Sequence, residues 1–361
     1  MNLQEEIQKD VEKKWYENNC KGTAALATGS GKSKILIDIV SKEKKPWLLV
    51  VPTEKLRDKN WKEEFKKWNK LHIYNTYITR CCYASLSKID LSQYDGCCLD
   101  EGHNISINNV QPFKNHHERL KLLVLTATIP RDDQKKHILF NMLKCNIIYE
   151  LSLKKAIEIG IVAPLKIYLH ELNLNVIRNI RVKTKKISFL QSEKGMYEYL
   201  CKKIDEKAFP TQMDYLLRAR FIYNSSTKTE YAKKLLAKLP SDKRILIFSQ
   251  SIKQIEEIMT EIYHSKTTDK YYDLFVNEKI NRLGVVESLN EGENIKNLDI
   301  GVILQCNSNP KNLFQRIGRI IRKRKNHEAQ IHILVLMNTV DEKWINNILI
   351  GYEDIITRIK N

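Results

Sequence analysis

The stretch Ala27-Thr28-Gly29-Ser30-Gly31-Lys32-Ser33 follows an apolar run at 24–27 and precedes a helical pattern that begins at Ile35. Its two glycines let backbone N–H groups turn toward an anion at the start of that helix. The pattern matches the core of a phosphate-binding loop, although Leu26 stands where the strict motif has its first glycine. A tight glycine turn before a helix is the alternative, and the GKS triplet weighs against it. The pattern predicts contacts to a nucleoside triphosphate from Thr28, Gly29, Ser30, Gly31, Lys32 and Ser33, with Lys32 on the β- and γ-phosphates and Ser33 also on Mg²⁺.

Around this loop, short apolar runs alternate with helical patterns in two blocks. Such runs are typical of buried parallel strands, and their alternation with helices predicts an α/β fold with parallel sheets. Helical spacing is found at 35–40, at 61–68 and at the isoleucines and methionine of 252–262. The expected strands are 47–51, 96–99 and 122–125 in the first block, and 245–248, 283–286, 302–304 and 331–336 in the second.

The length of 361 residues is enough for two domains with separate cores. We expect one domain at 1–165 and a second at 166–361, which carries a less regular, basic and partly helical insertion at about 171–235. Five basic residues of this insertion lie within nine positions and no acidic residue separates them. A solvated loop or hairpin and a nucleic-acid contact are equal alternatives for this run, which consists of Arg178, Arg181, Lys183, Lys185 and Lys186.

Composition restricts the class of partner. The chain has 61 lysines and arginines against 43 acidic residues, a net charge of +18, which favours a nucleic-acid partner over a role in solubility alone. No apolar run reaches the roughly 18–20 residues of a membrane span, and no signal peptide is apparent, so no membrane partner is expected. The eight cysteines include no CxxC motif, and they are expected to be buried, reduced thiols of a cytoplasmic protein.

Two further motifs follow predicted strands. Asp100-Glu101 ends the run at 96–99, at the edge where parallel sheets bind ligands. We expect Asp100 to hold Mg²⁺ through water and Glu101 to orient or deprotonate the attacking water. His103 is either a coupling residue or a surface histidine that caps the next segment. Thr126 and Thr128 of the TAT triplet either form a polar turn or supply hydroxyls that connect the Mg²⁺ site to the opposite domain.

A third motif, Gln315-Arg316-Ile317-Gly318-Arg319-Ile320-Ile321-Arg322, lies near the end of the chain. Its arginines recur at i, i+3 and i+6, so Arg319 and Arg322 are helical neighbours. A basic helical face is commonly only solvated. Arginine is also the residue that stabilises charge on a transferring phosphoryl group, an effect worth ~10³–10⁵ in rate.

The order of these motifs resembles that of the superfamily 2 helicases and translocases, and the resemblance covers nearly the whole chain. It implies two tandem RecA-like domains, each with a parallel sheet flanked by helices, and a nucleotide cleft between them. It also implies that Val51-Pro52-Thr53, followed by Leu56 and Trp61, is a nucleic-acid motif. The other roles that it implies are adenine reading by Gln4, nucleic-acid binding by Pro52, Thr53, Ser249, Gln250 and Ser288, nucleotide binding by Gly292 and Gln315, and catalytic fingers at Arg319 and Arg322.

Details of the motifs resemble one branch of this superfamily. DEGH, TAT and the string at 156–164 are similar to those of phage branch-migrating, excision-repair and restriction-type DNA motors, and differ from the DEAD-box pattern. The resemblance implies an ATP- and Mg²⁺-dependent enzyme that moves along or remodels DNA, with DNA favoured over RNA. A nucleic-acid-stimulated clamp or sensor that does not unwind, and an RNA helicase, are the alternatives. A protein partner could supply a strand-splitting element.

Overall fold

The chain divides into two units. The first consists mainly of Met1–Ala163 and the second mainly of Pro164–Asn290, Ile295–Ile321 and Lys325–Asn361. A computed structural model of the protein describes every residue except Met1, Lys55, His117, Thr128, Arg131, 184–187, 287–294, Lys296, 307–312, Phe314, Gln315, Arg319 and 321–327, and the side chain of Lys183.

In the first unit, the described strands form a six-stranded parallel sheet with the order β3-β2-β4-β5-β1-β6. The central strands β2 and β4 are buried along their whole length, and β1 and β5 at every residue except the first, as expected of a sheet covered on both faces. The strands predicted at 47–51, 96–99 and 122–125 are confirmed. The strands are β1 (Lys21–Leu26), β2 (Trp47–Val51), β3 (Ile78–Cys82), β4 (Gly96–Asp100), β5 (Lys121–Thr126) and β6 (Ile147–Leu151).

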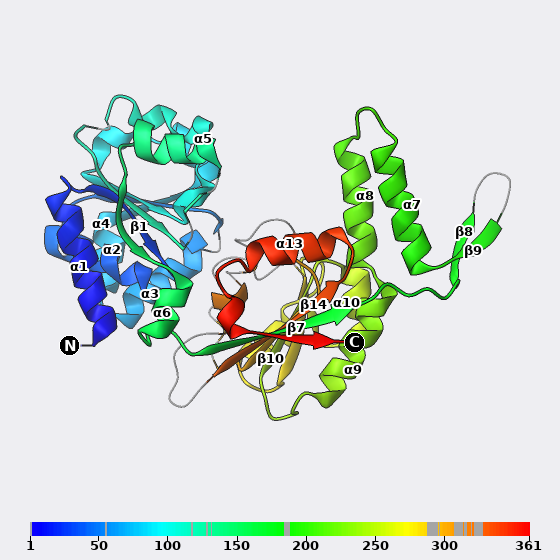
Figure 1. Ribbon diagram of the computed structural model, residues 1–361. Coiled ribbons are helices and arrows are strands. Elements are labelled where there is room, and N and C mark those ends of the chain that lie inside the picture. Colours follow the sequence, from blue (N-terminus) through cyan, green and yellow to red (C-terminus); the bar gives the residue numbers. More distant parts are fainter. Residues whose placement is uncertain are drawn as a thin grey trace. The chain divides into compact units, whose positions relative to one another are not determined.

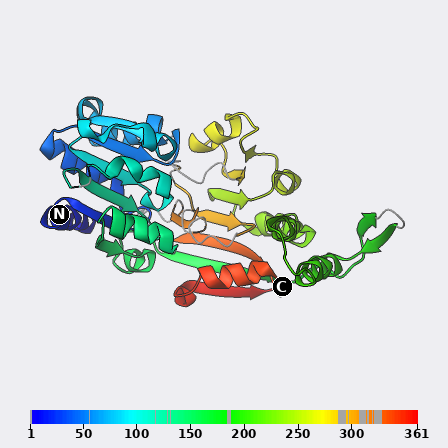
Figure 2. The same ribbon diagram turned by 90° about the horizontal axis from the view of Figure 1, so that it is seen from above.

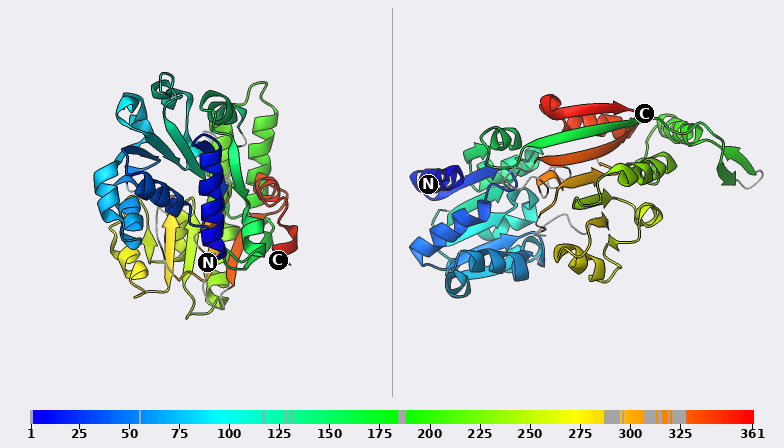
Figure 3. Two further views of the ribbon diagram at one scale, coloured as in Figure 1. Left: turned by 90° about the vertical axis from the view of Figure 1, so that its left-hand side faces the viewer. Right: turned by 90° about the horizontal axis from the view of Figure 1, so that it is seen from below.

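Helices surround this sheet, and Figure 3 shows the first of them, α1, in dark blue. Helix α1 packs against α2 and against the strands β1 and β6. The helices of the unit are α1 (Leu3–Glu17), α2 (Lys32–Glu43), α3 (Trp61–Lys67), α4 (Leu71–Tyr77), α5 (Asp133–Lys136) and α6 (Leu153–Glu158). Short π-helical segments span Leu56–Asn60 and His137–Met142, and 3₁₀ turns span Tyr83–Lys88, Leu91–Gln93, Gly102–Asn104, Ile107–Asn109 and Gln111–Phe113.

The order of the strands in this sheet brings three predicted motifs to one edge. Strands β4, β5 and β1 are neighbours and run parallel, so their carboxyl ends meet. Asp100 of β4 pairs with Leu125 of β5, and Thr126 of β5 pairs with Ala25 of β1. The phosphate-loop sequence, the DEGH motif and the TAT triplet therefore leave the sheet side by side.

The described strands of the second unit form a seven-stranded parallel sheet with the order β11-β12-β10-β13-β14-β7-β15. In Figure 3, β15 (red), β7 (green) and β14 (orange) run next to one another at one side of this sheet. The strands predicted at 245–248, 283–286 and 331–336 are confirmed, and the one predicted at 302–304 begins and ends earlier. The bounds are β7 (Leu165–Leu172), β10 (Ile245–Ser249), β11 (Ile262–Tyr263), β12 (Arg282–Val286), β13 (Ile300–Ile303), β14 (Ala329–Leu336) and β15 (Ile356–Lys360).

The segment predicted to be less regular is largely helical. It contains an antiparallel hairpin and three helices, and Figures 1 and 2 show that the hairpin lies beyond α7, on the side away from the seven-stranded sheet. These elements are β8 (Ile180–Lys183), β9 (Ser188–Gln191), α7 (Glu193–Asp205), α8 (Gln212–Tyr223) and α9 (Ser226–Lys238). The unit also contains α10 (Ile252–Ile258), α11 (Lys270–Val276), α13 (Val340–Ile348) and a 3₁₀ turn at Glu353–Ile355.

One prediction for this unit is wrong. The helix expected to extend to Ile262 ends at Ile258, and Ile262 begins the edge strand β11. The backbone already leaves the helix at Met259, where φ is −158° and ψ is 165°. Apolar residues at helical spacing continue across this boundary because both elements pack their side chains into one core, and this periodicity alone does not reveal where the helix ends.

All eight cysteines are free; six are buried as predicted, and Cys20 and Cys201 are only half-buried. In the described part of the chain, no helix is both long and apolar enough to cross a membrane.

Candidate active site

The glycine-rich stretch 27–33 forms the turn from β1 to α2. Gly29 and Gly31 have φ values of +90° and +84°, which only glycine adopts without strain. Helix α2 begins at Lys32, so the free N–H groups of its first turn and its positive dipole end face the loop. Inside the loop, Ser30 donates from its hydroxyl to the carbonyl of Ala27 at 2.8 Å. Thr28 and Ser33 are half-buried.

Two glutamines of α1 lie against this loop. Gln8 donates from Nε2 to the carbonyl oxygen of Gly31 at 3.2 Å. A Cβ atom at Gly31 would lie 2.4 Å from Nε2 of Gln8 and 2.6 Å from Nε2 of Gln4. Gln4 was predicted as a nucleotide-binding residue and Gln8 was not, although the spacing of i, i+4 places both side chains on one helical face.

Asp100 ends β4 in a buried position, and three neighbours fix its orientation. Its Oδ2 accepts a hydrogen bond from Nε1 of Trp61 at 2.8 Å, and its Oδ1 accepts one from the backbone N–H of Glu101 at 3.0 Å. Tyr83 donates from its hydroxyl to the backbone carbonyl of Asp100. Burial first, and then the neighbouring Glu101 carboxylate, raise the pKa of Asp100 to about 7. Sequence analysis included Trp61 only in a nucleic-acid motif and missed this contact.

Glu101 lies next to the phosphate loop and adopts a left-handed backbone with φ of +49°. Its Oε1 is 3.9 Å from Nζ of Lys32, which also donates to the carbonyl of Leu26 at 3.3 Å. The other carboxylate oxygen, Oε2, is buried and accepts no hydrogen bond from the described residues. Positive φ at a non-glycine residue costs energy, and such residues are enriched at functional sites.

His103 is buried, with 6% of its surface exposed, so the alternative of a surface histidine is wrong. Its Nδ1 lies 2.9 Å from Oγ1 of Thr126 and 3.5 Å from Oε2 of Glu101. Lys135 of α5 donates to the His103 carbonyl at 2.7 Å, a contact that no local sequence pattern indicated. The structure thus brings together the predicted acid, histidine and threonine hydroxyl within the first unit.

These residues fit a magnesium nucleotide. A bound cation would favour the ionised form of Asp100, whose pKa is raised, and would also offset the charge of the buried Glu101 oxygen. Ser33, Lys32 and the N-terminus of α2 supply the hydroxyl, the ammonium group and the N–H donors that phosphates require. No described group of three or more histidine, cysteine or acidic residues has the arrangement of an all-protein metal cage. Mg²⁺ is typically bound by one or two protein groups together with phosphate oxygens.

The predicted nucleic-acid contacts occupy different environments. Pro52 and Thr53 directly follow β2 and are half-buried, and Oγ1 of Thr53 accepts from the N–H of Leu56 at 3.4 Å. Ser249 is fully buried and donates from its hydroxyl to the carbonyl of Ser251, so it shapes the turn after β10. Gln250 is half-buried in the same turn. Contact with nucleic acid stays a prediction for these four positions.

Six predicted site residues lie outside the described residues: Thr128, Ser288, Gly292, Gln315, Arg319 and Arg322. Their roles stay predictions. Arg316 of the same motif is described, and only 2% of its surface is exposed. It donates from Nη1 to the carbonyl of Gln305 at 2.9 Å, so the alternative of a solvated basic face is wrong at this position.

Two protein families match parts of this chain. Residues 1–131 match the family described as type III restriction enzyme, res subunit, and residues 227–324 match the helicase conserved C-terminal domain. The two models cover the phosphate loop and DEGH in one unit and the arginine motif in the other. The chain is also 24% identical to the DNA 3′–5′ translocase XPB2 of Sulfurisphaera tokodaii, over 93% of this chain and 82% of the relative.

The chain belongs to the superfamily 2 helicases and translocases. Its two parallel sheets flanked by helices are the tandem RecA-like domains of that superfamily. The fold is shared with the helicase domain of Pyrococcus furiosus Hef, with a TM-score of 0.59 at 13% identity over 95% of this chain and 97% of that one. It is also shared with the DNA-bound type ISP restriction-modification enzyme LlaBIII, with a TM-score of 0.63 at 12% identity over 100% of this chain. This superfamily 2 chain spans only 31% of the length of the restriction enzyme.

Proposed function

We propose that the protein is an ATP-dependent DNA translocase or helicase that couples ATP hydrolysis to movement along DNA. The observation that carries this proposal is the meeting of the phosphate loop and the DEGH acids at one sheet edge, where Nζ of Lys32 lies 3.9 Å from Oε1 of Glu101. Membership of a superfamily of nucleic-acid motors supports the coupling to DNA.

In this proposal, each residue at the sheet edge has a role set by its chemistry. Lys32 and the N–H groups of 28–33 bind the β- and γ-phosphates, and Gln4 contacts the base. Mg²⁺, held by Ser33 and Asp100, would neutralise charge that develops on the phosphate oxygens. Glu101 holds the attacking water and takes its proton, and its left-handed backbone aims the carboxylate at the phosphate loop.

Further roles concern residues for which the superfamily supplies the argument. Arg319 and Arg322 stabilise the transferring phosphoryl group, and Gly292 and Gln315 contact the nucleotide. His103, Thr126 and Thr128 couple the nucleotide state to the second domain. The domain ranges proposed for these activities are 1–165 and 166–361.

DNA is the proposed substrate, with Pro52, Thr53, Gln250 and Ser288 on its backbone and Ser249 shaping the turn that presents Gln250. The net charge of +18 favours binding through phosphates, which weakens steeply with salt. The β8–β9 hairpin, with exposed Arg181 on β8 and exposed Phe189 and Leu190 on β9, is a further proposed contact. Basic and aromatic side chains on one element suit a strand backbone and its bases.

The test is ATP hydrolysis by the full chain with single-stranded DNA, duplex, fork, four-way junction or RNA. We expect stimulation by a DNA form and its loss in Lys32→Ala and Glu101→Gln. The control is Lys42→Ala, because Lys42 lies in the last turn of α2, is 62% exposed and pairs with Glu12. Equal hydrolysis by wild type and Lys32→Ala would refute the proposal. Turnover that neither displaces strands nor moves along DNA would favour a clamp, and stimulation by RNA alone would exclude a DNA motor.

A further inference from the structure

We propose that Gln305 is a positioning residue that ties the turn after β10 to the arginine segment 316–320, so that DNA contact at Gln250 controls the rate of ATP turnover. This inference rests on the proposed function and adds to it a route inside the second unit. No role was predicted for Gln305, which follows Leu304, the first residue after β13.

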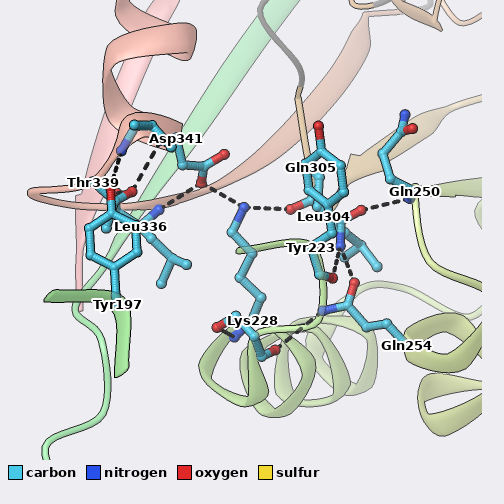
Figure 4. A network of polar contacts seen from close by, with 12 residues as sticks. Tyr197, Tyr223, Lys228, Gln250, Gln254, Leu304, Gln305, Leu336, Thr339 and Asp341 are labelled. Carbon is cyan, nitrogen blue, oxygen red and sulfur yellow. Dashed lines mark hydrogen bonds and ion pairs between the residues drawn. The ribbon is translucent and has the colours of Figure 1, made fainter. Parts of the chain in front are cut away.

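The side chain of Gln305 is fully buried and uses both atoms of its amide (Figure 4). Its Oε1 accepts a hydrogen bond from the backbone N–H of Gln250 at 2.8 Å. Its Nε2 donates to the carbonyl of Tyr223 at 2.8 Å and to Oε1 of Gln254. Gln305 therefore holds the turn that presents Gln250, while α8 and α10 hold Gln305.

The backbone of Gln305 makes the second half of the connection. Its carbonyl accepts from Nη1 of Arg316 at 2.9 Å, and the guanidinium of Arg316 lies over the ring of Phe248, 5.4 Å from its centre. Phe248 belongs to β10, two residues before Gln250. One residue therefore contacts the proposed DNA turn through its side chain and the arginine motif through its backbone.

The arginine motif is also fixed to β13 by close packing. A Cβ atom at Gly301 would lie 2.1 Å from Cδ1 of Ile320, so the side chain of Ile320 rests directly on the strand. Residues 316–318 and 320 are helical. With Arg316 bonded to Gln305 and Ile320 packed on Gly301, we expect a shift after β13 to move Arg316 and Ile320 with it.

A buried ion pair holds Leu304, the residue before Gln305, so the chain after β13 cannot move independently of the helix α9. Nζ of Lys228 donates to the carbonyl of Leu304 at 2.8 Å and pairs with Oδ2 of Asp341 at 2.6 Å, and neither side chain is exposed. Figure 4 shows Lys228 between Leu304 and Asp341, with Gln305 and Gln254 next to it. Lys228 and Arg316 thus hold the two consecutive carbonyls that directly follow β13, and motion at Gln250 has a defined path to Arg316.

The experiment compares Gln305→Met with Gln254→Met in the full chain. Each substitution removes one buried amide of similar size, and Gln254 likewise makes several hydrogen bonds, to Ser225, Thr229 and Gln305. Only Gln305→Met removes the hydrogen bond from the backbone N–H of Gln250. The readouts are the ATPase rate without DNA, the rate with saturating DNA, the KM for ATP and the DNA concentration that gives half-maximal stimulation.

We expect Gln305→Met to lower the stimulation by DNA about tenfold or more while its DNA-free rate and KM stay within about threefold of wild type. Gln254→Met should keep its stimulation within about threefold. Equal stimulation factors in the two variants, or a proportional fall of basal and stimulated rates in Gln305→Met, would overturn the inference and leave the proposed function intact. No stimulation of the wild type would instead reject the proposed function, and the inference with it.

A second measurement needs no variant and so does not depend on whether Gln305→Met folds. Hydrogen exchange of the wild-type chain is followed with and without single-stranded DNA, for peptides that cover 249–251 and 301–306. We expect DNA to change protection in both peptides together. A change confined to 249–251 would contradict the connection through Gln305.

Discussion

Replacing Lys228 by methionine should destabilise the second unit strongly, because its partner charge cannot reach solvent. Asp341 is fully buried, and its Oδ2 would keep only the N–H of Leu336, at 2.9 Å. Its Oδ1 makes no hydrogen bond with the described residues. Removing one member of a buried ion pair typically costs about 3–5 kcal/mol of unfolding free energy, and we expect this cost for Lys228→Met.

The double variant Lys228→Met/Asp341→Leu tests the origin of that cost. It removes both charges, and it also takes the side-chain partner from two buried backbone groups, the carbonyl of Leu304 and the N–H of Leu336. Leaving a buried polar group without a partner costs about 1–3 kcal/mol. The double variant should therefore lose about 2–6 kcal/mol, compared with about 6–10 kcal/mol if the two single costs of Lys228→Met and Asp341→Leu simply added.

The assay is hydrogen exchange against guanidinium chloride, read on peptides from β14 and α13, because two compact units need not unfold together. Lys233→Met is the control: Lys233 lies on the same helix, α9, is 41% exposed and pairs with Glu230. It should change stability by less than about 0.5 kcal/mol. If the double variant loses the sum of the two single costs to within about 0.5 kcal/mol, Lys228 and Asp341 do not act as a pair, and the reasoning is refuted.

Three further predictions concern single positions. Gly31→Ala should weaken ATP binding about tenfold or more with circular dichroism unchanged, because φ is +84° and a Cβ would collide with a glutamine amide of α1; wild-type affinity would contradict this. Trp61→Phe removes the hydrogen bond that lowers the pKa of Asp100, so that pKa should rise above about 7. The ATPase rate should then fall at neutral pH and recover as the pH is raised. A pH profile identical to that of wild type would count against this prediction. His170 and His332 share a 2.9 Å hydrogen bond, and burial lowers the pKa of each from 6.5 to about 4. The unfolded chain binds more protons between those values, so stability should be complete above pH 6.5 and fall by about 3 kcal/mol per histidine toward pH 4, and a urea midpoint that stays constant over this range would disprove it.

The features predicted from sequence alone are those that a single continuous segment of the chain forms, namely the buried strands and the motifs that follow them. The buried strands are short apolar runs, and the phosphate loop and DEGH follow them directly, so parallel pairing brings these motifs together without further information. The prediction that the helix extends to Ile262 was wrong, because the apolar spacing continues from the helix into the next strand. Contacts that join distant segments left no local signal. Trp61 and Asp100 are 39 residues apart and Lys228 and Leu304 are 76 apart, and only the sheet order makes them neighbours.

The carboxyl ends of parallel strands are used differently in the two units, and this difference supports the assignment of roles. At the end of β4, Asp100 has a raised pKa and Glu101 keeps a buried oxygen that accepts no hydrogen bond from the described residues, as expected of groups that bind a cation and a polarised water. Directly after β13, the carbonyls of Leu304 and Gln305 accept hydrogen bonds from buried cations, and the amide of Gln305 is bonded at both atoms. Polar groups that are satisfied by one another do not need a ligand, but they hold their neighbours in one arrangement. The first edge therefore has the properties of a reaction site, and the second those of a rigid support for the arginine motif.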